Sequence, residues 1–405
     1  MFWEKKLASW ADSVRTRTNV PARISLWNGQ SHDLGTFENP AVTLHAKSAA
    51  AMPLLLSPGL DTLGEAYVEG KIDIEGSLND LIDVGYALAR TAPESLGRRR
   101  RIEHYFAHSK AADQRAIQYH YDVSNEFYKL WLDRRMVYSC AYFENGEEDL
   151  ATAQQKKIDH ILTKIQLQPG QTLLDLGCGW GALVIRAARK FGARCVGITL
   201  SKNQFDWATE RVKAMNLSDR VEIRLQDYRD VTGRFDRVTS VGMFEHVGRR
   251  NLSEYFTRVQ SLLTEEGIAM NHGITTTSAK SDESGFGGDA FIDRYVFPDG
   301  ELPHLSLALS AMQEGGLEAF DVENLRRHYA RTLQLWSANY EANAPTLREM
   351  VDEQTFRIWR IYLGGCAYAF ENDDVAIYQI VARKAGMRAS KLPWSRRYMY
   401  DGYCG

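Results

Sequence analysis

The sequence predicts an α/β fold with a doubly wound, mostly parallel sheet, and three observations support this expectation. From about residue 160, short apolar strands alternate with amphipathic helices, which is the pattern of βαβ units. The first strand, in "QTLLDLGCGWG", runs directly into a glycine-rich turn. A later apolar run, Val238 to Phe244, ends in Glu245 and His246. Ligands of such sheets bind beyond the carboxyl ends of the strands, so we expect a site there.

The elements of the N-terminal part indicate a small α+β unit over residues 20–90. "RISLWNGQSHDLGTF" alternates around the turn at Asn28-Gly29, which is typical of a strand pair. We expect a short strand at 71–74 and a capped helix after Gly76-Ser77.

The first 18 residues predict an amphipathic helix with basic residues beside its apolar side. That side carries large residues at helical spacing: Phe2, Trp3, Leu7, Trp10 and Val14. The helix either docks on its own domain or lies in a membrane interface, and the pattern favours docking. The segment has charges where a signal peptide needs an apolar core, and no apolar run is long enough to span a bilayer.

A break in the pattern near 91–105 predicts a linker between two domains. It contains Pro93, Gly97 and four consecutive arginines, Arg98 to Arg101. We therefore divide the chain into a domain at 1–95, a basic linker at 96–115 and a second domain at 116–405. The arginines form a solvated hinge or contact anionic lipid, where each contributes about 1 kcal/mol.

The second domain follows in order along the chain. Its strands are expected at 171–176, 193–201, 220–228, 235–247 and 267–276, with helices at 182–192 and 202–216. An aromatic-rich, helical insertion at 275–370 precedes a last strand, "VAIYQIVARK".

Composition excludes several classes of protein. The net charge of −3 gives no global basic field for nucleic acid. The five cysteines are scattered without paired spacing, which argues against a disulfide framework or a metal site and fits a reducing, cytoplasmic compartment.

The glycine turn indicates a nucleotide-like ligand. Gly177, Gly179 and Gly181 let the backbone turn sharply and approach a ligand at a helix N-terminus. The spacing also tolerates a dinucleotide, but two features argue against NAD. Asp175 lies just before the first glycine, and the second strand ends in "VGITLS" with no acid for a ribose 2′-hydroxyl.

"LDLGCGWG" followed by "VGITLSKNQ" resembles the S-adenosylmethionine (SAM)-binding loop of class I methyltransferases. Further segments resemble the cyclopropane-fatty-acyl-phospholipid synthases and their mycolic-acid relatives. They are "YHYDVSNEFYKLWLDRRMVYSCAYF", "MFEHVG", "MNHGI", "FIDRYVFPDGELP" and "HYARTLQLW". The matches run in order from about 117 to 385, and residues 1–100 resemble the N-terminal lipid-binding domain of the phospholipid-acting members.

The resemblance implies a Rossmann-like SAM domain with a helical substrate-binding insertion, and it implies two sets of site residues. The residues expected to bind SAM are Tyr138, Ser139, Asp175, Gly177, Cys178, Gly179, Gly181, Thr199, Leu200, Ser201, Gln204, Gln226 and Asp227. The residues expected to hold a bicarbonate base are Cys140, Glu245, His272, Ile274 and Tyr329.

In that second set, Glu245 would accept the hydroxyl proton of bicarbonate, and His272 and Tyr329 would donate to it. Cys140 and Ile274 would offer backbone N–H groups. Without the resemblance, a lone histidine such as His272 is more often a hydrogen-bonded core residue. A cysteine such as Cys140 is more often a small buried hydrophobic residue. Cys366 is a further catalytic candidate, although no neighbour in sequence would activate it.

His246 is expected to point away from the site if the strand persists. The implied activity is addition of a methylene from SAM across a cis double bond of a phospholipid acyl chain. Two alternatives stay open: transfer that leaves a methyl branch or methylene group, and a catalytically dead lipid-binding protein. The resemblance also implies a homodimer, peripherally attached to the inner face of the membrane.

Overall fold

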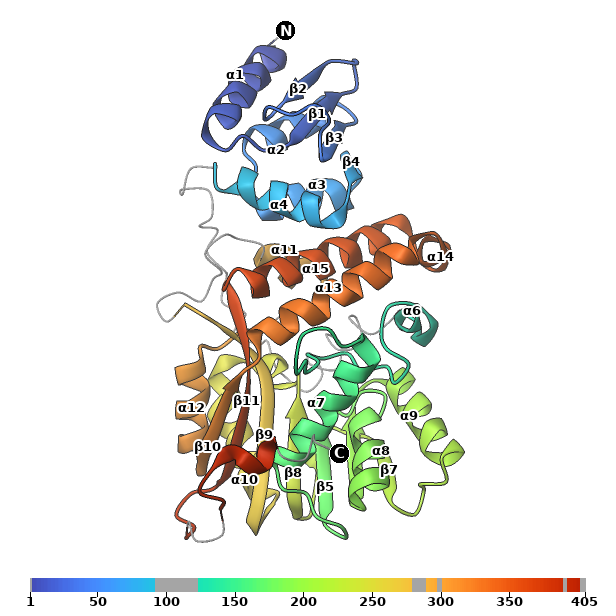
Figure 1. Ribbon diagram of the computed structural model, residues 1–405, viewed down its shortest axis with the longest axis vertical. Helices are drawn as coiled ribbons and strands as arrows, with labels where there is room; N and C mark the ends of the chain where they lie inside the picture. The colour runs from blue at the N-terminus through green and yellow to red at the C-terminus, as the bar shows by residue number, and fades with distance from the viewer. Residues whose placement is uncertain (1, 92–122, 279–288, 297–300, 389–391, 401–405) are drawn as a thin grey trace.

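Three layers follow one another along the long axis of the molecule: an N-terminal unit, a helical layer and a large sheet (Figure 1). The computed structural model describes residues 2–91, 123–278, 289–296, 301–388 and 392–400. The predicted linker at 96–115 lies outside the described residues, as do the first residues of the motif that begins at Tyr119.

The N-terminal unit is a four-stranded sheet in the order β2-β1-β3-β4, packed with helices. The predicted strand pair around Asn28-Gly29 is β1 and β2, which run antiparallel, and the helix capped by Ser77 is α4. The strands are β1 (Ala22–Leu26), β2 (Ser31–Asp33), β3 (Val42–Ala46) and β4 (Ile72–Gly76). The helices are α1 (Phe2–Arg17), α2 (Met52–Leu56), α3 (Leu60–Val68) and α4 (Leu78–Ala89).

The first helix docks on its own unit, as the sequence pattern favours. Leu7, Ala11 and Val14 of α1 are buried and belong to the same apolar cluster as the strands β1 and β3. Trp10 packs against that cluster and is half-buried. The buried residues Leu7, Ala11 and Val14 therefore face the N-terminal unit itself.

The second sheet has seven strands in the order β10-β11-β9-β8-β5-β6-β7. Neighbouring strands from β7 to β9 are parallel, whereas β11 runs antiparallel to both β9 and β10. This is the predicted doubly wound α/β sheet. The strands are β5 (Thr172–Leu176), β6 (Arg194–Thr199), β7 (Val221–Leu225), β8 (Phe235–Val241), β9 (Leu263–Thr276), β10 (Leu317–Asn324) and β11 (Val375–Lys384).

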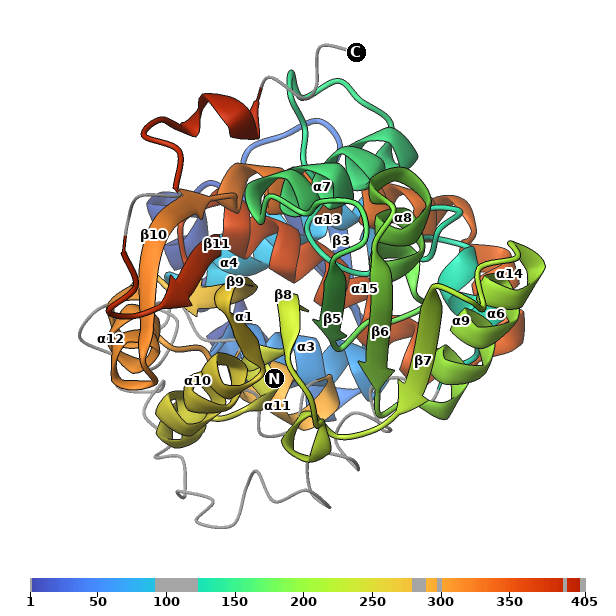
Figure 2. The same cartoon turned by 90° about the horizontal axis from the view of Figure 1, so that it is seen from below.

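Helices cover both faces of this sheet, as the view along its edge shows (Figure 2). Helices α7 (Leu150–Lys164), α8 (Ala182–Phe191) and α9 (Lys202–Ala214) share one apolar cluster with it. Helices α10 (Leu252–Ser261) and α12 (Leu305–Glu314) share another. The remaining helices are α6 (Asn125–Lys129), α11 (Asp289–Tyr295), α13 (Arg326–Ala342), α14 (Ala344–Met350) and α15 (Glu353–Glu371). No helix in the described ranges is long and apolar enough to cross a bilayer.

Two expectations about the second domain need correction, and one helix was not expected. The strand β8 ends at Val241 because Gly242 turns the chain with a φ of 66°, so Glu245 lies in a short 3-10 helix (Phe244–His246) and not on the strand. The insertion at 275–370 contains the edge strand β10 as well as helices. The helix α7 was not expected at all.

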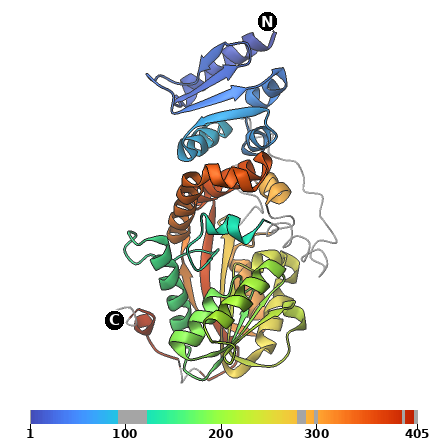
Figure 3. The same ribbon diagram turned by 90° about the vertical axis from the view of Figure 1, so that its right-hand side faces the viewer.

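The helix α15 packs between the N-terminal unit and the rest of the second domain (Figure 3). The Arg357 guanidinium donates to the Tyr67 carbonyl at 2.8 Å and to the Asp73 carboxylate at 2.6 Å. Nearby, Gly364 lies so close to Leu78 that an added Cβ would be 2.9 Å from its Cγ. The N-terminal unit and the helical layer therefore form a close interface with both polar and apolar contacts.

Candidate active site

A cavity lies at the carboxyl ends of β5, β6 and β8, where the fold predicts a ligand. The glycine turn "GCGWG" between β5 and α8 forms part of its wall. Gly177, Gly179 and Gly181 have φ values of 80°, 53° and 82°, a backbone conformation that residues other than glycine rarely adopt. An added Cβ on Gly177 would also meet Met243 at 3.3 Å. The glycines thus bring bare backbone to the edge of the cavity.

Most residues expected to bind SAM line this one cavity, which we call the cofactor cavity. They are Tyr138, Ser139, Asp175, Gly177, Cys178, Gly179, Thr199, Leu200, Gln204, Gln226 and Asp227. Gly181 and Ser201 are not among the lining residues. Gly181 is the N-cap of α8, and the Ser201 hydroxyl accepts from the backbone N–H of Gln204 at the start of α9. These two residues shape the turns behind the wall.

Two polar pairs fix the far side of the cavity. The Thr199 hydroxyl donates to Gln204 Oε1 at 2.8 Å, between the end of β6 and the start of α9. The Asp227 carboxylate accepts from both the backbone and the guanidinium of Arg229. These bonds hold the side chains in fixed positions before any ligand arrives.

A buried acid and a buried amine face the inner end of the cavity. Asp175 accepts from the Thr239 hydroxyl at 2.7 Å, and burial raises the pKa of its carboxyl to about 6. Lys157, on α7, donates to the Ser139 hydroxyl at 2.7 Å, and burial lowers the pKa of its ammonium to about 8. Lys157 was not predicted from the sequence as a site residue. Its spacing of four residues from Ala153 and from Ile161 would have placed it on the buried face of a helix.

Glu245 lies buried behind this cavity with one half of its carboxylate engaged. The Ile274 backbone N–H donates to Glu245 Oε1 at 2.7 Å. We expected this N–H to bind an external anion, but in the structure it binds the carboxylate. The other oxygen, Oε2, is buried and has no hydrogen-bond partner among the described residues. Burial raises the pKa of this carboxyl to about 7. A buried acceptor of this kind is costly unless something binds it.

His272 is fully buried on β9 and is also half satisfied. Its Nδ1 lies 3.1 Å from the amide nitrogen of Gln379 on β11, while its Nε2 has no hydrogen-bond partner among the described residues. Burial lowers the pKa of the imidazole well below its usual value, with the nearby Lys157 adding to the effect. The ring is therefore neutral at physiological pH and has one nitrogen available.

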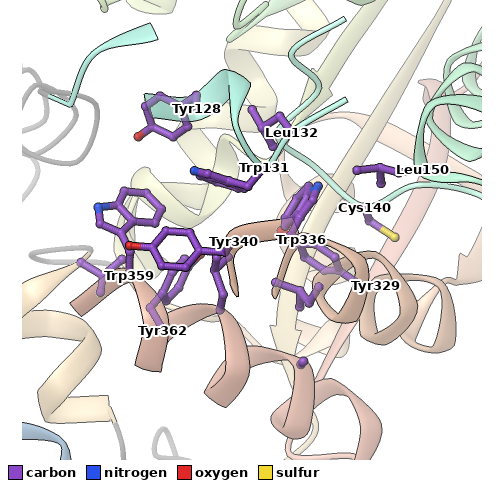
Figure 4. Packing of buried hydrophobic residues seen from close by; sticks show 14 of the residues in the cluster. Tyr128, Trp131, Leu132, Cys140, Leu150, Tyr329, Trp336, Tyr340, Trp359 and Tyr362 are labelled. Atoms are coloured by element: carbon purple, nitrogen blue, oxygen red, sulfur yellow. The ribbon is translucent and has the colours of Figure 1, made fainter. Parts of the chain in front are cut away.

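The other expected residues belong to an aromatic cluster under α13 and α15 (Figure 4). Tyr329 and Cys140 are buried in it, and Ile274 packs against it. Burial raises the pKa of the Cys140 thiol, so the thiol stays protonated. The rings that form most of the cluster are Phe127, Tyr128, Trp131, Tyr138, Trp336, Tyr340, Trp359 and Tyr362. Such faces stabilise a cation in a dry site.

His246 corrects a further expectation. Because the chain leaves the sheet at Gly242, residue 246 does not follow the alternation of a strand, and His246 lines the cofactor cavity. The position of this side chain depends on one glycine, which the apolar pattern of the segment conceals.

Cys366 lies on α15 at the edge of the aromatic cluster, and burial raises the pKa of its thiol to about 12. A thiolate nucleophile requires a lowered pKa, so we expect Cys366→Ala to keep turnover within about twofold of the wild type. Initial rates of S-adenosylhomocysteine release measure this. A loss of more than about a hundredfold with SAM binding intact would instead give this thiol a chemical role.

The raised pKa of Glu245 predicts a pH-dependent stability. A carboxyl whose pKa is raised on folding, here from 4.5 to about 7, stabilises the fold fully below pH 4.5, and this contribution is lost as pH rises toward about 7. Relative to Glu245→Gln, the unfolding free energy of the wild type should fall by about 3 kcal/mol over that range. Urea denaturation of both proteins in carbonate-free buffer measures the difference, and a difference constant with pH would contradict the prediction.

The strand order and the glycine turn at the cofactor cavity define a class I SAM-dependent methyltransferase. The sequence profile of the mycolic acid cyclopropane synthetase family matches residues 108–380, and the chain belongs to that family. Residues 9–95 match a domain of unknown function, DUF7884.

Individual relatives agree with this assignment. A probable fatty acid methyltransferase of Pseudomonas putida is 46% identical over 389 residues, which cover 94% of this chain and 97% of that protein. The cyclopropane-fatty-acyl-phospholipid synthase of Escherichia coli K12 is 38% identical over 276 residues, 67% of this chain and 69% of that one. The structure of the mycolic acid cyclopropane synthase CmaA1, complexed with SAH and CTAB, superposes with a TM-score of 0.64 at 35% identity. It covers 67% of this chain and 98% of that chain.

Proposed function

We propose that this methyltransferase adds a methylene from SAM across the cis double bond of a phospholipid acyl chain, giving a cyclopropane. The observation that carries the proposal is a pair of buried polar atoms, Glu245 Oε2 and His272 Nε2, in a site bordered by aromatic rings. Neither atom has a hydrogen-bond partner in the part of the chain that the structure describes. One atom accepts and the other can donate, which is the pairing that a small protonated oxyanion needs.

The chemistry requires a base in a dry pocket. The alkene attacks the sulfonium methyl, the S–C bond breaks, and S-adenosylhomocysteine leaves a carbocation on the acyl chain. A proton is then removed from the new methyl group, and the C–H electron pair closes the three-membered ring. A bound bicarbonate would supply the base for this proton. Rings of the aromatic cluster such as Tyr138, Trp336 and Tyr362 would stabilise the cation and exclude water.

The residues of the chain have defined roles in this proposal. Glu245 accepts the hydroxyl proton of the anion through Oε2 while the Ile274 N–H holds its other oxygen. His272 donates through Nε2, and the Tyr329 phenol, whose pKa burial raises, donates from α13. The amide of Cys140 is the further donor expected from the family resemblance.

We further propose that the enzyme works at the membrane surface, because its substrate chain belongs to a bilayer. The N-terminal unit, residues 1–95 by our division, would bind lipid, and the arginines of the linker at 96–115 would contact anionic headgroups. Attachment to the inner face of the membrane, a cytoplasmic location and a homodimer stay predictions.

Incubation with SAM and vesicles of a monounsaturated phospholipid tests the proposed reaction. We expect a fatty acid heavier by one CH₂, with cyclopropane signals and no alkene in the NMR spectrum. A second function has support in the 46% identical relative, which carries the name of a fatty acid methyltransferase. A product of the same mass that keeps an alkene would favour methyl transfer without ring closure. Absence of product despite SAM binding would favour a lipid-binding role.

A further inference from the structure

A row of polar side chains crosses three strands beside the site. Glu323 of β10 lies opposite Gln379 of β11, which lies opposite His272 of β9. Directly opposed residues share one face of a sheet, so the three side chains form a continuous row. Gln379 and His272 are fully buried. A neutral amide therefore separates the imidazole from a charged residue.

The contact between Gln379 and His272 determines where the imidazole proton lies. The Gln379 side-chain nitrogen is 3.1 Å from His272 Nδ1, and an amide nitrogen can only donate. A ring nitrogen that accepts carries no proton, so the neutral ring bears its proton on Nε2. Nε2 is the nitrogen for which the described ranges of the chain offer no hydrogen-bond partner. Gln379 thus leaves His272 with one free donor.

Burial keeps the His272 ring neutral, and the charges around it add to the effect. Three basic groups of α7 face it, Lys157, His160 and Lys164, and Glu323 is the acid nearby on β10. That acid is already engaged: its Oε2 lies 2.8 Å from His160 Nε2 and against the Lys164 ammonium. On the other side, Glu245 and Tyr329 belong to the proposed anion site. A second proton on the ring would therefore lie near two lysine ammonium groups, while the acid on β10 is already paired.

We propose that Gln379 is a positioning residue that holds His272 in the neutral form with its proton on Nε2. In this form the ring can donate to the bound anion, whose hydroxyl group in turn donates to Glu245. The inference rests on the proposed function and adds a requirement to it. In metal sites, a hydrogen-bond partner that orients a ligating histidine typically changes the affinity for the bound group about 10- to 100-fold. Gln379 itself does not line the cofactor cavity.

Nitrogen-15 NMR of the histidine rings tests the tautomer without any turnover. His272→Asn identifies the His272 signals among the 10 histidines. In the wild type, we expect Nε2 protonated and Nδ1 bare from about pH 6 to pH 9. In Gln379→Glu, the introduced carboxylate should draw a proton onto Nδ1. Tyr378→Phe, the neighbouring position on β11, removes only a bond with Asn324 and should leave the His272 signals unchanged.

Kinetics supply the second test. Gln379→Leu should raise the bicarbonate KM at least about tenfold at every pH, with SAM affinity unchanged. Gln379→Glu should raise the pKa of His272, so below that pKa the imidazolium still donates from Nε2. Above it the remaining proton stays on Nδ1 and Nε2 is bare. The bicarbonate KM of this variant should therefore increase as pH rises, whereas that of the wild type should not.

The outcomes separate the two proposals. A wild-type ring with its proton on Nδ1 would overturn the role of Gln379, whatever the kinetics. A uniform loss in Gln379→Glu without the new pH dependence would do the same. Wild-type turnover that is indifferent to bicarbonate would instead overturn the proposed base, and the NMR result would still determine the tautomer. Isothermal titration with SAM shows that each variant is folded.

Discussion

Glu245→Gln should lower turnover by at least about a hundredfold and leave SAM affinity within about twofold of the wild type. The Ile274 N–H can still donate to the amide oxygen, so the local fold should survive. The change falls on the other half of the side chain, where an NH₂ donor replaces the acceptor Oε2, which no described residue binds. The residue does not line the cofactor cavity, which is why binding of SAM should be unaffected.

Product formation on unsaturated phospholipid vesicles and calorimetric titration with SAM measure the two quantities. Glu254→Gln is a matched control, because Glu254 is exposed on α10 and the same atoms are exchanged. It should behave as the wild type in both assays. Full turnover of Glu245→Gln in bicarbonate-free buffer would exclude Glu245 as a holder of the base.

Gly273→Ala should cost about 3 kcal/mol of stability and more than tenfold in turnover. An added Cβ at this position would lie 2.0 Å from Cε1 of Phe244, far inside van der Waals contact. Phe244 is buried and precedes Glu245 in the same 3-10 helix. The following residue, Ile274, donates to the Glu245 carboxylate. The methyl group therefore pushes apart the two segments that hold the acid.

Chemical denaturation and initial rates check both effects, and a second substitution separates them from a general loss of folding. Phe244→Leu should restore part of the stability when it is combined with Gly273→Ala, since the shorter side chain vacates the contact. Gly365→Ala on α15 is the control glycine, because its added Cβ meets no atom within 4 Å. A Gly273→Ala protein as stable and as active as the wild type would show that Phe244 moves freely.

The sequence predicted the parts of the fold that depend on apolar periodicity. The buried positions of strands such as β5 and β6 are mostly apolar, and amphipathic helices follow these strands, so their βαβ order was recognisable. The strand β10 was not expected because "LEAFDVEN" carries four acidic or amide side chains at an edge, where only Leu317 and Asp321 are buried. Helix α7 was overlooked because its buried face holds polar groups such as Lys157 and His160.

The positions of side chains within the site were harder to predict. Most of the SAM set line one cavity because they follow strands whose ends meet at one edge of the sheet. The direction of His246 depends on the positive φ of Gly242, which no periodicity reveals. Gln379 could have been noticed, since it is an amide within the apolar strand "VAIYQIVARK". Its partner across the sheet required the register of β9 and β11.

The two domains that the sequence separates are packed together through the helix α15. One side of this helix carries Trp359 and Tyr362 of the aromatic cluster, while Arg357 and Gly364 contact the N-terminal unit. A catalytic fragment prepared without residues 1–95 would expose this second side to water and leave Arg357 without the Asp73 carboxylate. Proteolysis between the two units should yield fragments that copurify. For this enzyme, domain exchange or minimisation would have to redesign a helix that also contributes rings to the aromatic cluster.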